Sequence, residues 1–166
     1  MIILGLNAYH ADASACIVHD GDLIAAAEEE RFNRIKHWAG FPIEAIRYCL
    51  RESGIGIKDV DYIAINRRPG ANFFRKAAHV LSKRYSVRAL LDRLANVKKV
   101  GTIQSRMCSG FGIEYSELKA KIYQVEHHRA HLAGSFFVAP FESAAVVSVD
   151  GFGDFASTMW GEGKGR

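Results

Sequence analysis

Two histidines four positions apart, His127 and His131, are the first residues in this sequence whose types and spacing could do chemistry. The surrounding run reads as a strand that leads into a helix, and side chains at i and i+4 lie on one face of a helix. Asp150 follows an apolar run, residues 144–149, which predicts a buried strand. Two imidazoles and a carboxylate are the ligands of a divalent metal site. The alternative is a pair of surface or core histidines without a ligand.

The stretch from Asp150 to Asp154 carries a second candidate. We expect a strand-to-strand turn in which Gly151 and Gly153 take positive φ and expose backbone N–H groups. Such a nest of N–H groups binds phosphate oxygens, so Gly151, Gly153 and Asp154 are candidate nucleotide-binding residues. A simple glycine hairpin is the alternative. His128 lies one step round the helix and is expected to point elsewhere.

Several elements must position these residues. The apolar patterns predict strands at residues 2–6, 14–19, 22–28, 61–66 and 122–125. Asp20-Gly21 predicts a type I′ hairpin turn, because both central positions of that turn need positive φ. Pro42 and Gly54 are typical of the first turn and the end of a helix. From residue 71 to residue 110 the apolar spacing is helical.

The order of these elements resembles the ribonuclease-H-like lobe of the actin and sugar-kinase superfamily. We therefore expect an α/β fold with a mixed sheet, flanking helices and a helical insertion at residues 66–110. The 166 residues, 49% hydrophobic and 24% charged, indicate one globular lobe, residues 1–166. No apolar run is long enough to span a membrane, and three scattered cysteines favour a reducing, cytoplasmic setting.

Charge is unevenly distributed. The net charge is +4, but residues 66–106 contain eleven Lys and Arg against one acid, Asp92. Such a basic segment is either a solvated helical face or a surface that binds an anionic partner.

Taken together, five stretches resemble the N-terminal part of the bacterial O-carbamoyltransferases of nodulation and antibiotic biosynthesis. They are residues 3–8 with His10 and Asp12, residues 25–37, residues 40–42, residues 125–131 and residues 149–154. The His-His-x-Ala-His element alone is also similar to the hydrogenase-maturation and the tRNA threonylcarbamoyl transferases. The run Ala-Ala-Ala-Glu-Glu-Glu-Arg-Phe points to the first group.

The resemblance implies a two-step reaction. Another domain makes carbamoyl-adenylate from carbamoyl phosphate and ATP, and the carbamoyl group then passes to a hydroxyl of a sugar-type or natural-product acceptor. The implied metal ligands are His127, His131 and Asp150, with Fe²⁺ expected and Mn²⁺ or Zn²⁺ also compatible. From motif position, His10 or Asp12 is the expected proton acceptor, and Arg31 and Lys36 the expected partners of the anionic adenylate.

The family resemblance also implies parts that this sequence lacks. Members of the family are several times longer, so we expect a truncated chain whose partners are a second lobe and an adenylate-forming domain. Nucleic acid is not an expected partner. The alternative function is a non-catalytic metal- or nucleotide-binding interaction module that uses the basic helical insertion.

Overall fold

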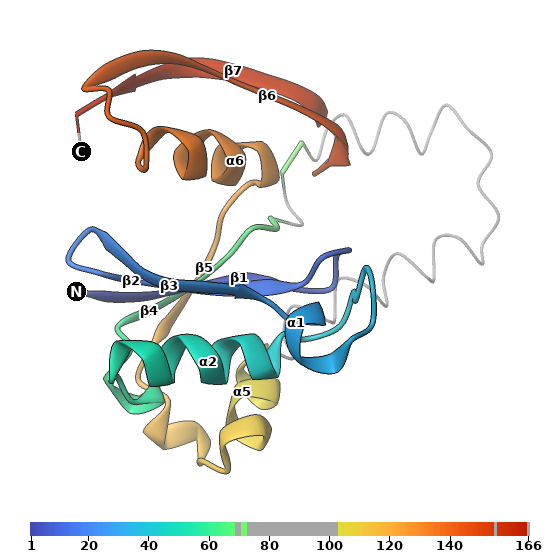
Figure 1. The fold of residues 1–166 in the computed structure, drawn as a ribbon, viewed down its shortest axis with the longest axis vertical. Helices are drawn as coiled ribbons and strands as arrows, with labels where there is room; N and C mark the ends of the chain where they lie inside the picture. Colours follow the sequence, from blue (N-terminus) through green and yellow to red (C-terminus); the bar gives the residue numbers. More distant parts are fainter. Residues whose placement is uncertain (69–70, 73–102, 155, 166) are drawn as a thin grey trace, which may run out of the picture. The chain divides into compact units, whose positions relative to one another are not determined.

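The computed structural model describes residues 1–68, 71–72, 103–154 and 156–165, and these fall into two compact units (Figure 1). Residues 1–65 and 103–123 belong to the first unit, and the remaining described residues belong to the second. The expectation that residues 1–166 form a single lobe stays a prediction. The last two strands pair only with each other in the described structure and do not join the larger sheet.

A five-stranded mixed sheet forms the first unit, in the order β3-β2-β1-β4-β5. Strand β2 runs antiparallel to both neighbours, and β4 runs parallel to β1. The strands are β1 (Ile2–Asn7), β2 (Ser14–His19), β3 (Asp22–Glu28), β4 (Tyr62–Ile65) and β5 (Lys121–Gln124). The sheet, with helices packed on it, confirms the expected α/β class, the mixed sheet and the flanking helices.

The β2–β3 hairpin turns as the sequence predicts. Asp20 has φ 52° and Gly21 has φ 97°, so both central residues of the turn are left-handed. After β3, the single-turn helix α1 (Glu30–Asn33) leads to α2 (Ile43–Ser53). Pro42 immediately precedes α2, and Gly54 ends it with φ 66°. Both helix boundaries agree with the expected positions of Pro42 and Gly54.

Glu29 anchors the start of α2. Its carboxylate is buried and accepts hydrogen bonds from the backbone N–H groups of Glu44, at 3.3 Å, and Ala45, at 2.8 Å. These N–H groups lie in the first turn of the helix and have no partner within it, so the carboxylate satisfies them. Two short 3₁₀ turns, η1 (Ile57–Asp59) and η3 (Tyr115–Glu117), complete the connections that the structure describes in this unit.

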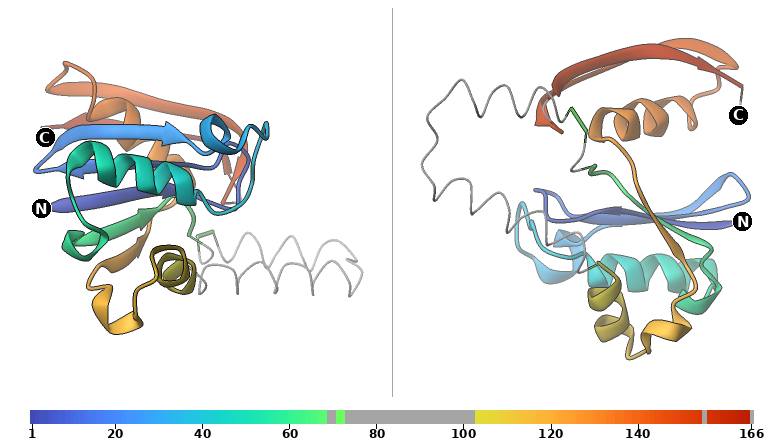
Figure 2. Two further views of the ribbon diagram at one scale, coloured as in Figure 1. Left: turned by 60° about the horizontal axis from the view of Figure 1, so that its bottom comes forward. Right: turned by 180° about the vertical axis from the view of Figure 1, so that it is seen from behind.

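The core of the first unit lies between the sheet and two helices, α2 and α5 (Ile103–Phe111), which Figure 2 shows on the same face. Ile103 and Met107 of α5 are fully buried beside Ile46 of α2 and Leu4 of β1. The end of the expected insertion at residues 66–110 is therefore part of the core. Residues 73–102, which contain most of the basic segment, lie outside the described residues.

Helix α6 (His127–Phe136) and a two-stranded antiparallel sheet, β6 (Ser143–Gly153) with β7 (Ala156–Lys164), form the second unit. The prediction that residues 144–149 form a buried strand is wrong, although a strand is present there. One helix covers one face of a two-stranded sheet, so residues alternate between covered and open faces. Val147 is 65% exposed and Val149 78% exposed, and Trp160 of β7, opposite Val147, is 80% exposed. No helix among the described residues is long and apolar enough to cross a membrane.

Candidate metal centre

Helix α6 begins where the sequence predicts. Its N-cap is Glu126, whose carboxylate accepts a hydrogen bond from the backbone N–H of Arg129 at 2.8 Å. His127 is consequently the first residue of the helix, and His131 follows one turn later on the same face. This local geometry places both imidazoles beside the end of β6, where Asp150 lies.

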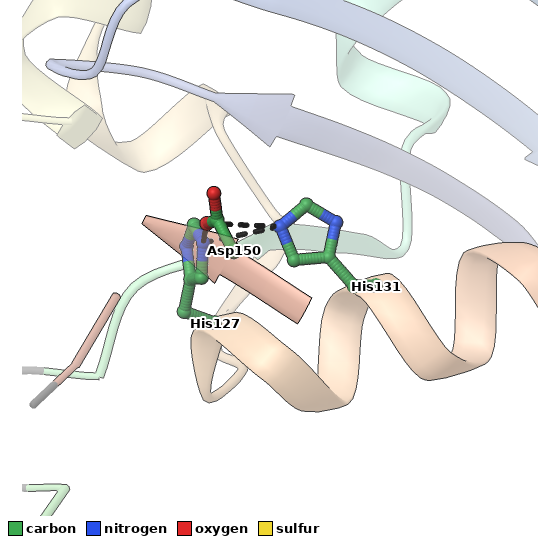
Figure 3. Close-up of side chains that lie close together, drawn as sticks. All are labelled: His127, His131 and Asp150. Atoms are coloured by element: carbon green, nitrogen blue, oxygen red, sulfur yellow. Dashed lines mark hydrogen bonds and ion pairs between the residues drawn. The ribbon is translucent and has the colours of Figure 1, made fainter. Parts of the chain in front are cut away.

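The three predicted ligand residues converge (Figure 3). Nε2 of His127 lies 2.7 Å from Oδ2 of Asp150 and 3.1 Å from Nε2 of His131. Nε2 of His131 lies 3.6 Å from the same carboxylate oxygen. Three potential ligand atoms therefore form a small triangle, which is the arrangement that the spacing in the sequence predicts. Metal binding itself stays a prediction.

Hydrogen bonds alone cannot account for all three contacts among these atoms. Nε2 of His127 is the shared corner, and a neutral imidazole nitrogen either donates one hydrogen or accepts one. If it donates to Asp150, it cannot also accept from His131, and if it accepts, its lone pair faces the carboxylate at 2.7 Å. A cation at the centre would interact favourably with the lone pairs of all three atoms. The donor set thus fits a bound metal ion better than a hydrogen-bonded cluster.

The distances also suit a metal. Bonds from a divalent transition metal to N and O ligands are about 2.0–2.2 Å, so neighbouring ligand atoms are about 3.0 Å apart in octahedral and about 3.4 Å apart in tetrahedral geometry. The observed separations of 2.7, 3.1 and 3.6 Å bracket these values. Small side-chain adjustments would bring all three atoms to bonding distance of one ion.

The centre is buried on one side and open on the other. The His127 side chain is only 9% exposed, whereas those of His131 and Asp150 are 49% and 41% exposed. The hydrogen bond from His127, with a second from the backbone N–H of Gly151, lowers the pKa of Asp150 below its ordinary 3.8. Asp150 is therefore an anion at neutral pH. The open side leaves room for further ligands or a substrate atom.

Asp150 faces the helix from a strand whose regular pairing ends just before it. Regular pairing of β6 with β7 stops at Val149, opposite Thr158, and resumes at Gly153, opposite Ala156. Residues 150–152 of β6 therefore lie opposite the single residue 157 of β7. This irregularity is a β-bulge. Bulges occur next to active sites because they redirect side chains. The sequence contains no obvious signal for this one other than the glycines on both sides of Phe152.

Gly153 supports His127 directly. A Cβ atom built on Gly153 would lie 2.0 Å from the His127 ring, so only glycine lets the strand approach the imidazole this closely. The expected positive φ at Gly151 and Gly153 is wrong, because neither is left-handed and both belong to β6. The left-handed residue is Asp154, with φ 46°.

Asp154 ties three segments together. Its carboxylate accepts hydrogen bonds from the backbone N–H of His127, at 3.1 Å, and of Arg68, at 2.9 Å. Its carbonyl accepts one from the side-chain amide of Asn72 at 3.0 Å. These contacts give Asp154 a clear structural role at the first turn of α6. Phosphate binding by Gly151, Gly153 and Asp154 stays a prediction.

His128 is a residue whose importance the sequence did not reveal. It points away from the metal centre, as expected, but it is completely buried. Its Nδ1 lies 2.9 Å from the hydroxyl of Ser148, and its Nε2 lies 3.0 Å from the carbonyl oxygen of Ala156. The available signal in the sequence was Ser148, a polar residue within an apolar strand, two positions before Asp150.

The other predicted site residues belong to the first unit. Asp12 lies in the loop after β1, and its carboxylate is 2.9 Å from Nδ1 of His37, which follows α1. Both residues are exposed and left-handed, with φ 62° and 53°. The side-chain amide of Asn7 holds the loop by donating to the carbonyl of Asp12 at 2.9 Å. His10 is half-buried in the same loop.

The two expected cations lie close by in the sequence. Arg31, in α1, pairs with Glu28 at 3.3 Å, and both Arg31 and Lys36 are exposed. The described structure thus brings Asp12 together with His37, which belongs to the same stretch, residues 25–37, as Arg31 and Lys36. Arg31 and Lys36 themselves are exposed to solvent. Their roles, and that of His10, stay predictions.

Comparison with known proteins now adds to this geometry. An uncharacterized protein, sll1178, of Synechocystis sp. is 37% identical over 99% of the chain, and the nodulation protein NolNO of Sinorhizobium fredii is 32% identical over 96%. The chain spans only 28% and 22% of these relatives. A solved structure, YeaZ from Pseudomonas aeruginosa, matches with 17% sequence identity and a TM-score of 0.42. The match covers 90% of this chain and 55% of the YeaZ chain.

The family model gives the decisive match. The model described as the carbamoyltransferase N-terminus matches residues 2–166, which is nearly the whole sequence. The match includes the loop of Asp12, the His37 segment and the three converging ligand residues. The chain therefore belongs to the carbamoyltransferase N-terminus family.

Proposed function

We propose that this chain is the metal-holding part of a carbamoyltransferase that passes a carbamoyl group to the hydroxyl of a sugar-type or natural-product acceptor. The proposed donor is carbamoyl-adenylate, made from carbamoyl phosphate and ATP elsewhere in the longer protein. Membership of the family supports the transferase activity. The single structural observation that supports the proposal is the convergence of three ligand atoms from His127, His131 and Asp150.

These three residues would hold one divalent ion. Imidazole and carboxylate ligands suit Fe²⁺, Mn²⁺ and Zn²⁺, and Fe²⁺ is our first choice from the family resemblance. When bound, such an ion acts as a Lewis acid that polarises a carbonyl oxygen or neutralises phosphate charge. The chain's own contribution is to fix the ligands: Gly153 and Asp154 hold His127, and β6 presents Asp150 towards α6.

The loop after β1 is the proposed source of the proton acceptor. Transfer to a hydroxyl requires a base, because the attacking oxygen must lose its proton. Asp12 can accept this proton directly. Alternatively, Asp12 accepts a hydrogen bond from Nδ1 of His37, which leaves Nε2 of His37 as the acceptor. His10 lies in the same loop and is the remaining candidate.

Two exposed cations support binding of an anionic donor. Arg31 and Lys36 lie on the segment that leads from β3 to His37, and a guanidinium or ammonium group pairs with phosphate oxygens. Their pairing with carbamoyl-adenylate is therefore proposed. The basic segment at residues 66–106, on which the alternative of an interaction module depends, lies largely outside the described residues.

Metal content tests the proposal. We expect the purified chain to bind about one divalent ion, measured by elemental analysis after loading with Fe²⁺ or Mn²⁺ without oxygen, consistent with one three-ligand site. The double variant His127→Ala, His131→Ala is expected to bind none. His19→Ala is the matched control, because His19 is an exposed histidine in the β2–β3 hairpin. Equal metal content in all three proteins would reject the site.

Activity needs a separate test with the full-length protein. Carbamoyl phosphate, ATP and a panel of sugars and glycosides are supplied, and carbamoylated product is detected by mass spectrometry. We expect product with the unchanged protein and none with the double histidine variant. Product formation that is unaffected by this variant would reject a role for the metal centre in transfer.

A further inference from the structure

The buried imidazole of His128 carries an inference that deepens, and rests on, the proposed metal site. His128 is completely buried, although it lies between two histidines that face the candidate metal centre. Its ring centroid is 5.4 Å from that of His127 and 6.2 Å from that of His131. A buried polar ring needs partners for both nitrogens. The identity of these partners shows what the ring does.

The two partners define the state of the ring. Nε2 faces the carbonyl oxygen of Ala156 at 3.0 Å, and a carbonyl only accepts, so Nε2 carries a hydrogen. In this tautomer Nδ1 accepts a hydrogen bond from the hydroxyl of Ser148 at 2.9 Å. Both nitrogens are thus satisfied within the second unit. The ring therefore cross-links helix α6 to both β6 and β7.

The positions of these partners relative to the bulge are informative. Ser148 is opposite Met159 in regular pairing, one residue before that pairing stops at Val149. Ala156 is opposite Gly153, where pairing resumes. His128 therefore bonds to one residue on each side of the irregular segment. The segment between them contains Asp150, the carboxylate ligand.

We propose that His128, together with Ser148, is a positioning pair that fixes the bulge of β6 so that Asp150 reaches the two imidazoles. Side chains of successive strand residues point to opposite faces, so a shift of one residue would turn Asp150 away from α6. The two hydrogen bonds that link His128 of α6 to Ser148 and Ala156 oppose such a shift. His128 and Ser148 touch neither the metal nor a substrate in this account.

Ser148→Ala is the test variant, because it removes one hydrogen bond and little volume while all three ligands remain. The probe is Co²⁺ titrated into the 166-residue chain, since its visible absorption reports both affinity and the geometry of the ligands. We expect Ser148→Ala to weaken Co²⁺ binding roughly 10–100-fold, as the loss of partners that orient ligands generally does. We also expect the absorption bands to change, because Asp150 is no longer held.

Two further variants separate positioning from general stability. Ser148→Thr keeps the hydroxyl and is expected to retain affinity within a few-fold. Phe136→Leu is the matched control, because Phe136 is a buried residue of α6 that packs against Gly163 of β7, away from the bulge. It is expected to lower the unfolding temperature without changing the Co²⁺ spectrum.

The outcomes are distinguishable. Unchanged affinity and spectrum in Ser148→Ala, with normal binding by the unchanged chain, would overturn the positioning role and leave the metal site intact. Equal losses in Ser148→Ala and Phe136→Leu would also overturn it, since general destabilisation would then explain both. If the unchanged chain takes up no Co²⁺, or the His127→Ala, His131→Ala variant binds it equally, the metal site fails and the positioning role fails with it.

Discussion

The candidate metal centre of the second unit and the contact between Asp12 and His37 in the first unit are built differently. In the second unit, His127, His131 and Asp150 converge within 4.8 Å, with His127 nearly buried. In the first unit, Asp12 and His37 form a single contact, and their side chains are 52% and 76% exposed. The three converging residues of the second unit suit an ion that stays bound. The exposed Asp12 and His37 suit a molecule that binds, reacts and dissociates.

The supports of the two arrangements differ in the same way. Polar contacts of Asp154 and of the buried His128 hold β6 and α6 together around the candidate metal centre. The Asp12 and His37 loops are joined mainly by backbone, through the N–H of Ala13 and the carbonyl of Trp38 at 2.9 Å. Left-handed backbone at both Asp12 and His37 is sparsely populated for residues other than glycine, and such conformations cluster at functional sites.

The largest expected effect comes from the exposed pair. In the full-length protein, Asp12→Asn should lower the rate of carbamoyl transfer about 10²–10⁴-fold, the usual contribution of a general base. Metal content should stay at the level of the unchanged protein, because Asp12 is not one of the converging ligands. Rate and metal content are measured on the same preparation. Loss of metal in Asp12→Asn would contradict the separation of the two roles.

Replacing the carboxylate ligand should have the opposite pattern. Asp150→Asn keeps the size of the side chain but removes the anion, so Co²⁺ affinity should fall by about 100-fold or more, beyond the cost of losing an orienting partner. The pKa of Asp150 is lowered, so the carboxylate is charged at any pH at which the imidazoles bind metal. Isothermal titration at pH 7.5 measures the change. Retained affinity would show that the two histidines bind the ion without Asp150.

The core of the first unit provides a check on variants of the exposed pair. Burial raises the pKa of Cys49 to about 11 from 9.0, and the neighbouring Cys16 contributes. At pH 8 the thiolate fraction is therefore about 100-fold lower than for an ordinary thiol, and only the thiolate reacts. Alkylation of the folded chain at Cys49 should be slow, and should accelerate as the pH rises towards 11 or as the chain unfolds. Fast labelling of Asp12→Asn at pH 8 would reveal damage to the fold.

The glycines of β6 give the smallest and sharpest contrast. Gly153→Ala should lower Co²⁺ affinity by about tenfold. All three ligand side chains are still present, but the new methyl group would push the His127 ring out of position. Gly151→Ala is the matched control, since a Cβ there meets nothing within 4 Å. The two variants are compared by the same titration. Equal affinities would show that the His127 ring can move without cost to the site.

Local signals in the sequence predicted much of the fold. The turn at Asp20-Gly21, the helix between Pro42 and Gly54 and the start of α6 depend on residues within a few positions, and each is found as expected. The spacing of His127 and His131 belongs to the same class, because the period of a helix fixes it. The family followed from several such motifs taken together.

Features that depend on distant partners were not predictable. An apolar run such as residues 144–149 indicates a strand but not whether one or two faces are covered, so the exposure of Val147 and Val149 was missed. The bulge at Asp150 arises from pairing with β7, and the role of His128 arises from Ser148 and Ala156, which lie 20 and 28 positions away. The turn conformation at Gly151 and Gly153 was wrong for the same reason.

The open face of the β6–β7 sheet has a practical consequence for handling the chain. Val147, Val149 and Trp160 form a row of bare apolar side chains on a ribbon of two strands. Such ribbons adhere to one another through their apolar surfaces and their strand edges. We therefore expect concentrated preparations of the 166-residue chain to self-associate and precipitate on storage, and a single Trp160→Lys exchange to keep them clear.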